Sequence, residues 1–294
     1  MNFWKFFFEK EEVEGVAVVR ILIGVLLITS ALLLLPGLLD YFGPQGMLKF
    51  KTVIATLGNS RLNLFSWLGD SSTILWIIFT THLLASISMT LGFSTRLSTL
   101  IAYITLTSLH HRNLLILNSG DTALRVVLFL LIFSRAGDAY SLDRVLKLRS
   151  GKVIGEPLPQ APWALRLIQL QTTFIYLATS IHKFNGQAWA NGNAIYYTSR
   201  LWDFERFPVP YLLDHLASIH LLTWISLALE FALGTLIWIS PLRLPLILAG
   251  ICFHLGIEYS MNIPIFEFTM IALLIGMIPS QVIKNQISAI WPRK

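Results

Sequence analysis

Long apolar segments constrain this chain more than any other feature of its sequence. A helix needs roughly 20 predominantly apolar residues to cross the hydrocarbon core of a bilayer. Runs of about this length lie at residues 16–35, 72–92, 96–117, 121–139, 163–183, 216–239, 243–258 and 264–283. Because lipid cannot hydrogen-bond to the backbone, such segments must be helical inside a membrane. The sequence therefore predicts an all-α bundle of about eight transmembrane helices.

The composition indicates the same class of protein. Of the 294 residues, 55% are hydrophobic and 13% are charged, whereas soluble domains carry about 25% charged residues. A soluble core could not bury so much apolar surface, so we expect a lipid bilayer around the chain. The basic residues form no cluster interleaved with aromatic residues, which argues against nucleic-acid binding. The single cysteine, Cys252, excludes an internal disulfide.

Basic residues between the apolar segments predict the orientation. With a cytoplasmic N-terminus, more Lys and Arg fall on the inner side than on the outer side, as the positive-inside rule requires. The loop at residues 140–162 contributes most, through Arg144, Lys147, Arg149 and Lys152. We therefore expect a multi-pass protein of the cell membrane with both termini cytoplasmic. It would form a single transmembrane domain over residues 1–294, without a separate soluble domain.

The segment 163–183 carries a stripe of polar side chains that ends in an amine. Its members recur every three or four residues and would share one face of a helix: Gln169, Thr173, Tyr176, Ser180 and Lys183. Polar residues in a membrane helix normally face the bundle interior, so Lys183 is a candidate functional residue. The alternative is a lysine that extends to the interface from a helix end.

A second polar group lies between the third and fourth segments, where His110, His111, Arg112 and Asn113 precede Asp121. Ser119 or Asp121 can cap the next helix, and Asp121 can pair with Arg125 four residues later. One interpretation is a polar helix hairpin whose groups satisfy one another. The other is that His110 or His111, with Arg112, lines the same cavity as Lys183.

Ionisable residues also occur in the later segments. Glu230 lies inside an apolar run, so its carboxylate must be paired, hydrogen-bonded or protonated. His254 and Glu258 are four residues apart and could touch. No metal site is predicted from them, because transition metals usually require three or four protein ligands. His82, in mid-segment, is interpreted as a hydrogen-bonding group between helices.

Several of these motifs together resemble the HTTM family, the horizontally transferred transmembrane domain related to vitamin K-dependent gamma-carboxylase. They lie in order along the chain, at residues 92–96, 109–113, 118–121, 141–143, 166–183, 189 and 253–255. The resemblance implies a membrane enzyme that oxidises a vitamin K-like hydroquinone with oxygen. It implies Lys183 as the base that deprotonates the hydroquinone, and His110 or His111 as a catalytic partner.

The same resemblance implies a reduced quinone as cofactor and no metal. Residues near these motifs are the candidate substrate-binding groups: Arg112, Asn113, Tyr176, His182, Trp189, Glu230 and His254. The animal carboxylase continues into a large lumenal domain that holds its protein substrate, which has no counterpart in residues 1–294, so a different substrate is expected. The alternative function is a non-catalytic lipid-binding protein, or a partner in maturing or exporting a peptide.

Overall fold

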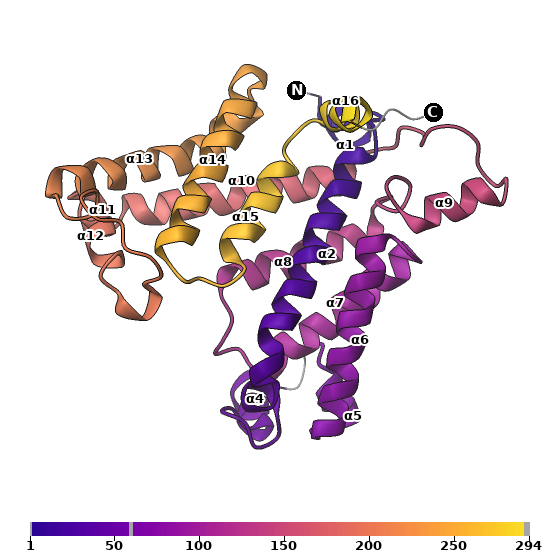
Figure 1. Ribbon diagram of the computed structural model, residues 1–294, viewed down its shortest axis with the longest axis horizontal. Coiled ribbons are helices and arrows are strands. Elements are labelled where there is room, and N and C mark those ends of the chain that lie inside the picture. Colours follow the sequence, from indigo (N-terminus) through magenta and orange to yellow (C-terminus); the bar gives the residue numbers. More distant parts are fainter. Residues whose placement is uncertain (1, 59–60, 291–294) are drawn as a thin grey trace. The chain divides into compact units, whose positions relative to one another are not determined.

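The computed structural model describes residues 2–58 and 61–290, and this part of the chain is helical with no β-strand (Figure 1). The prediction of an all-α fold is confirmed. The chain folds into two compact units. Unit 1 comprises Met1–Arg166 and Pro279–Lys294, and unit 2 comprises Leu167–Ile278.

Unit 1 is built around four helices that pack in chain order. Helix α2 packs against α6, α6 against α7, and α7 against α8. The helices of this unit are α1 (Phe3–Phe8), α2 (Glu14–Leu34), η1 (Leu35–Gly37), α3 (Leu38–Phe42), α4 (Phe50–Leu57), α5 (Leu64–Leu68), α6 (Ser72–Leu91), α7 (Thr95–Arg112), α8 (Ser119–Phe133), α9 (Leu142–Arg149) and α16 (Ser280–Ile290). Its apolar core includes Phe42, Phe65, Leu75, Ile78 and Leu109.

Local signals explain where these helices begin and end. The Ser71 side chain accepts a hydrogen bond from the Ile74 amide and caps the start of α6. After the last helical residue, Leu91, the chain turns at Gly92, which has a positive φ of 69°. Helix α8 is capped by the side chain of Asn118, and the backbone N–H of Asn118 donates in return to the Asp121 carboxylate. The expectation that Ser119 or Asp121 caps α8 is therefore corrected to Asn118, with Asp121 as its partner.

Polar side chains link the helices of unit 1. His82 Nδ1 lies 3.1 Å from Thr105 Oγ1 on the neighbouring helix, which confirms the prediction for His82. Arg20 on α2 is fully buried and donates to the carbonyls of Ala136, at 2.6 Å, and Tyr140, at 2.5 Å. This arginine fixes the segment between α8 and α9.

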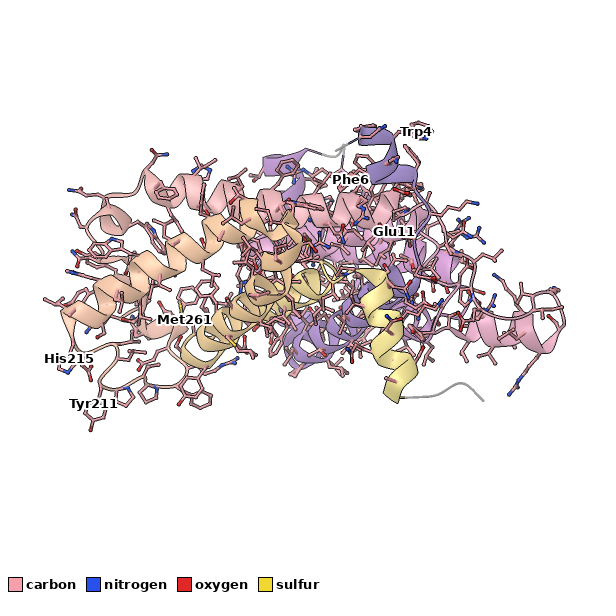
Figure 2. All side chains as sticks on the ribbon, turned by 90° about the horizontal axis from the view of Figure 1, so that it is seen from above. Trp4, Phe6, Glu11, Tyr211, His215 and Met261 are labelled. Atoms are coloured by element: carbon pink, nitrogen blue, oxygen red, sulfur yellow. The ribbon has the colours of Figure 1, made fainter. Side chains whose placement is uncertain are left out.

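Unit 2 contains most of α10 (Trp163–Phe184), whose first residues belong to unit 1. Its other helices are α11 (Gln187–Ala190), α12 (Ala194–Thr198), η2 (Trp202–Phe204), α13 (Leu216–Thr235), η3 (Leu236–Trp238), α14 (Ser240–Ser260) and α15 (Phe266–Ile275). Helix α14 packs against both α13 and α15. In the loop before α13, Tyr211 and His215 are exposed and point outward, as Figure 2 shows.

Four helical stretches in the described residues are long and apolar enough to cross a membrane: Glu14–Phe42, Ser72–Leu91, Leu216–Trp238 and Ser240–Ser260. A fifth exists if α15 and α16, which are separated by a break, together form one span. Each of the eight predicted segments overlaps a helix, but the third and fourth extend beyond the ends of α7 and α8, and the last is interrupted. The number of eight spans, the cytoplasmic termini and the single domain stay predictions.

Candidate functional site

An ion pair between Lys183 and Glu230 is the centre of the candidate site in unit 2. Lys183 Nζ, near the end of α10, lies 2.6 Å from Oε1 and 2.7 Å from Oε2 of Glu230 on α13. The Lys183 side chain is 25% exposed and that of Glu230 is 9% exposed. The carboxylate in the apolar run is thus paired, as the sequence required, and the amine is the accessible member.

The indole ring of Trp189 contacts the lysine end of this pair, and a second aromatic contact involves the residues that follow Lys183 and Glu230 in sequence. The Trp189 ring, on α11, lies with its centroid 4.4 Å from Lys183 Nζ, within the range of a cation–π contact. Phe184 and Phe231 make an edge-to-face contact, with ring centroids 5.9 Å apart. The ammonium group therefore contacts both a carboxylate and an indole face.

A close approach of two helix backbones positions the ion pair. Gly234 follows Glu230 by one turn of α13, and a Cβ atom there would lie 2.8 Å from the backbone nitrogen of Leu177 on α10. Only glycine permits this separation without displacing a backbone. The contact brings α13 near enough for Glu230 to reach Lys183.

The polar stripe of α10 faces the interior of unit 2, as predicted. Gln169, Thr173, Tyr176 and Ser180 are all buried. Gln169 donates to the carbonyl of Gly276, at 2.8 Å, which ties α10 to the end of α15. His182 precedes Lys183 but is exposed, so it lies off the stripe.

A buried polar chain extends from the same stripe. The Tyr176 hydroxyl lies 2.7 Å from His254 Nε2, and His254 Nδ1 contacts a carboxylate oxygen of Glu267 on α15. All three residues are at most 3% exposed. A carboxylate contact at Nδ1 orients the ring and favours a proton on that nitrogen, which leaves Nε2 to accept from the tyrosine hydroxyl. The group can hold and redistribute a proton away from bulk water.

Glu267 was not among the sequence candidates. The signal was available, since an acidic residue in the apolar helix α15 needs a partner just as Glu230 does. The contact between His254 and Glu258 that was considered from the sequence does not form. His254 contacts Tyr176 and Glu267, while Glu258 forms an ion pair with Arg206.

The two candidate histidines of unit 1 have different surroundings. His111 Nδ1 lies 2.8 Å from the Leu62 carbonyl, and its Nε2 lies 3.0 Å from Arg125 Nη1. Since the carbonyl can only accept and the guanidinium can only donate, His111 is a neutral ring protonated on Nδ1. Its remaining lone pair is occupied.

His110 is the more available of the two for chemistry. It is buried, and its Nε2 lies 3.8 Å from Asp121 Oδ1. Its Nδ1 has no hydrogen-bond partner among the described residues. Asp121 and Arg125, considered as a pair from the sequence, attract each other electrostatically, and they also make separate contacts with His110 and His111.

Arg112 and Asn113 hold the loops of unit 1 together. The fully buried Arg112 guanidinium donates to Asp70, at 3.1 Å, and to the carbonyls of Leu48 and Gly43, at 2.6 and 2.9 Å. Asn113 Nδ2 donates to the Tyr41 carbonyl, at 2.7 Å. This geometry is structural, and a substrate-binding role for Arg112 and Asn113 stays a prediction.

The candidate residues are divided between the units. Lys183, His182, Trp189, Glu230, Tyr176 and His254 belong to unit 2, while His110, His111, Arg112 and Asn113 belong to unit 1. The prediction that both sets line one cavity remains a prediction. In the parts of the chain that the structure describes, no three His, Cys, Asp or Glu side chains are grouped as metal ligands would be.

Comparison with known proteins gives one match over most of the chain. A family model described as the HTTM domain matches residues 8–279. No curated protein and no solved structure is significantly similar to the chain. The matched region includes every candidate residue described above.

Proposed function

We propose, from the premise that the chain belongs to the HTTM family, that this integral membrane protein is an enzyme that oxidises a reduced quinone to its epoxide with oxygen. One oxygen atom enters the epoxide, and the other leaves as water with the two hydroxyl hydrogens of the reduced quinone. Lys183 is the proposed base, acting at the outer face of the membrane. The observation that carries the proposal is the Lys183–Glu230 pair, in which the buried carboxylate lies behind a partly exposed amine. Intramembrane ionisable groups at such positions are functional candidates by default.

The residues around Lys183 suit a reduced quinone. When bound, this group supplies two reducing equivalents and a weakly acidic hydroxyl. The Trp189 indole beside the amine offers flat aromatic surface to a flat ring. Lys183 offers the nitrogen that could receive the hydroxyl proton, and Glu230 lies too deep to contact the ligand first.

Glu230 has a definite role in this proposal. An ammonium ion in an ion pair holds a proton and cannot act as a base. When a bound ligand covers the partly exposed amine and displaces its water, two separate charges become unfavourable, and a proton can pass from Lys183 Nζ to a Glu230 oxygen 2.6 Å away. The amine is then neutral and can take a proton from the ligand hydroxyl, which restores the ammonium beside a newly formed anion.

The buried Tyr176–His254–Glu267 chain supports the same centre. Tyr176 and Lys183 lie on one face of α10, separated by about two helical turns, or roughly 10 Å. The chain locks α10 against α14 and α15 through Tyr176 OH and His254. We assign it a positioning role, because none of its members is exposed enough to contact a ligand.

Oxygen uptake by the purified protein tests the base. The full chain in mild detergent would receive a short-chain reduced naphthoquinone, and wild type would be compared with Lys183→Arg. Arginine keeps the positive charge beside Glu230 but does not release its proton at accessible pH. We expect a loss of activity of at least about a hundredfold, within the range for general-base groups.

Lys152→Arg is the matched control, since it makes the same exchange at an exposed lysine of unit 1 and should retain activity. Full activity in Lys183→Arg would show that Lys183 is not the base.

A second, non-catalytic function follows if the only role of the ion pair is to hold α10 against α13. Lys183 and Glu230 join α10 to α13, and the segment between α12 and α13 exposes large aromatic side chains, with Trp202 81% and Tyr211 78% exposed. Such a surface fits a lipid-binding protein or a partner for an exported peptide. Extraction of ligands from the purified protein separates these functions. A stoichiometric quinone supports the enzyme, whereas a phospholipid or a co-purifying protein supports the second function.

A further inference from the structure

We propose that unit 1 binds the phosphate of an anionic phospholipid in a cavity at the turn between α6 and α7, apart from the function proposed above. The cavity has a volume of about 590 Å³. Three cationic residues line it: Arg96 at the start of α7, Arg135 after α8, and Lys147 on α9. We call it the turn cavity.

The position of the turn cavity along the chain places it at a membrane surface. Helix α6 is one of the stretches able to span a bilayer and ends at Leu91, so the residues just after it lie near the lipid headgroups. Apolar side chains beside the cavity are exposed: Phe93 is 50%, Leu97 59% and Phe133 47% exposed. This arrangement fits a ligand with a charged head and apolar chains.

The charges of the turn cavity favour an anion. Asp143 accepts hydrogen bonds from the amides of Ser94 and Thr95, both at 2.8 Å, so its carboxylate is already satisfied. Asp138 is shared by Arg135 and Lys147, at 2.7 and 3.7 Å. Arg96 is exposed and forms no ion pair with an acidic side chain among the described residues.

A neighbouring cavity and helix α9 extend this surface. Arg96 and Arg135 also line a second cavity of about 200 Å³, whose wall includes Phe133 and Trp163. Helix α9 exposes Leu142, Val145, Leu146 and Leu148. A helix with apolar and basic faces settles in the interface of anionic membranes. The predicted orientation places this side in the cytoplasmic leaflet, which carries anionic lipid.

Native mass spectrometry of the delipidated full chain tests the proposal, with dioleoyl phosphatidylglycerol and dioleoyl phosphatidylcholine as probes. Wild type should retain one phosphatidylglycerol in preference to phosphatidylcholine. The variant Arg96→Gln/Lys147→Gln should bind phosphatidylglycerol about thirtyfold more weakly, since each basic residue contributes about a fivefold factor near a membrane surface. The control Arg149→Gln/Lys152→Gln removes the same charges from exposed positions outside the cavity and should bind as wild type.

Equal losses in both double variants would indicate diffuse attraction and overturn the proposal. Displacement of the lipid by an equal concentration of inorganic phosphate would overturn the lipid as ligand, since it would indicate a free-phosphate site. If the double variant is not monodisperse, Arg96→Gln alone should show about a fivefold loss, and unchanged binding in this variant would overturn the proposal.

Discussion

Removal of either partner of the Lys183–Glu230 ion pair should destabilise the protein by unequal amounts. In Lys183→Met, the Glu230 side chain, only 9% exposed, is left without its cation. Loss of one partner of a buried pair costs about 3–5 kcal/mol. We expect the lower end, because Glu230 can take up a proton.

The opposite substitution should cost less. In Glu230→Gln, the Lys183 side chain is 25% exposed, and its flexible stem can move the ammonium into solvent. The loss should be about 1 kcal/mol, as for a pair that is largely exposed. The double variant should then be more stable than Lys183→Met alone, since no buried charge is left unpaired.

Urea unfolding in mixed micelles, followed by circular dichroism, would measure the free energies of unfolding for the four proteins. Lys152→Met serves as the control, because it removes an exposed lysine. The coupling free energy of the cycle should be about 1–3 kcal/mol. Strictly additive losses, or a larger loss in Glu230→Gln than in Lys183→Met, would refute the description of a buried carboxylate neutralised by an accessible amine.

Two further predictions concern other parts of the chain. Gly234→Ala should cost about 1–3 kcal/mol of folding free energy, because its Cβ would press on the Leu177 backbone. The control Gly256→Ala on α14, with open space around it, should be neutral or stabilising. Equal unfolding midpoints for the two variants would contradict this prediction. Asp143 should make folding pH-dependent. Burial alone raises its pKa, but hydrogen bonds from Thr95 and Ser94, with the charge of Lys147, hold that pKa below its ordinary value. The stabilisation from Asp143 is therefore complete above the ordinary Asp pKa and disappears as the pH falls through the lowered pKa. Thermal melts of Asp143→Asn should lack this loss of stability at acid pH. A variant with the same pH profile as wild type would contradict the role assigned to Asp143.

The sequence predicted which surfaces are buried better than which residues meet. A three- and four-residue period placed Gln169, Tyr176 and Ser180 on one face, and that face is buried. The cost of a carboxylate in an apolar helix predicted that Glu230 would be satisfied. Both arguments use only local geometry and solvation, which the sequence contains.

Partners on different helices could not be predicted in the same way. Pairs four residues apart were considered for Asp121 with Arg125 and for His254 with Glu258. Contacts between helices are added to the first pair and replace the second. A helix contacts its neighbours along its whole length, so many registers satisfy the same pattern. Gly234 selects one register through backbone contact, which no periodic pattern reveals.

The number of spans shows a related difficulty. Helices α7, α8 and α10 lie where spans were predicted but are too polar or too short to be assigned as spanning by length and composition. Their polar residues are buried inside the units, as in Thr99, Thr107 and Ser180. Hydropathy alone cannot separate such a helix from one outside the membrane.

Product analysis with isotopically labelled oxygen tests the central claim most directly. The purified wild-type protein, given a reduced naphthoquinone and labelled oxygen, should form the quinone epoxide with one labelled oxygen atom, the other leaving as water, and Lys183→Arg should not. Equal incorporation of the label by both proteins, or its absence from wild type while the added quinone is bound, would contradict the assignment of Lys183 as the base of an enzyme that forms a quinone epoxide.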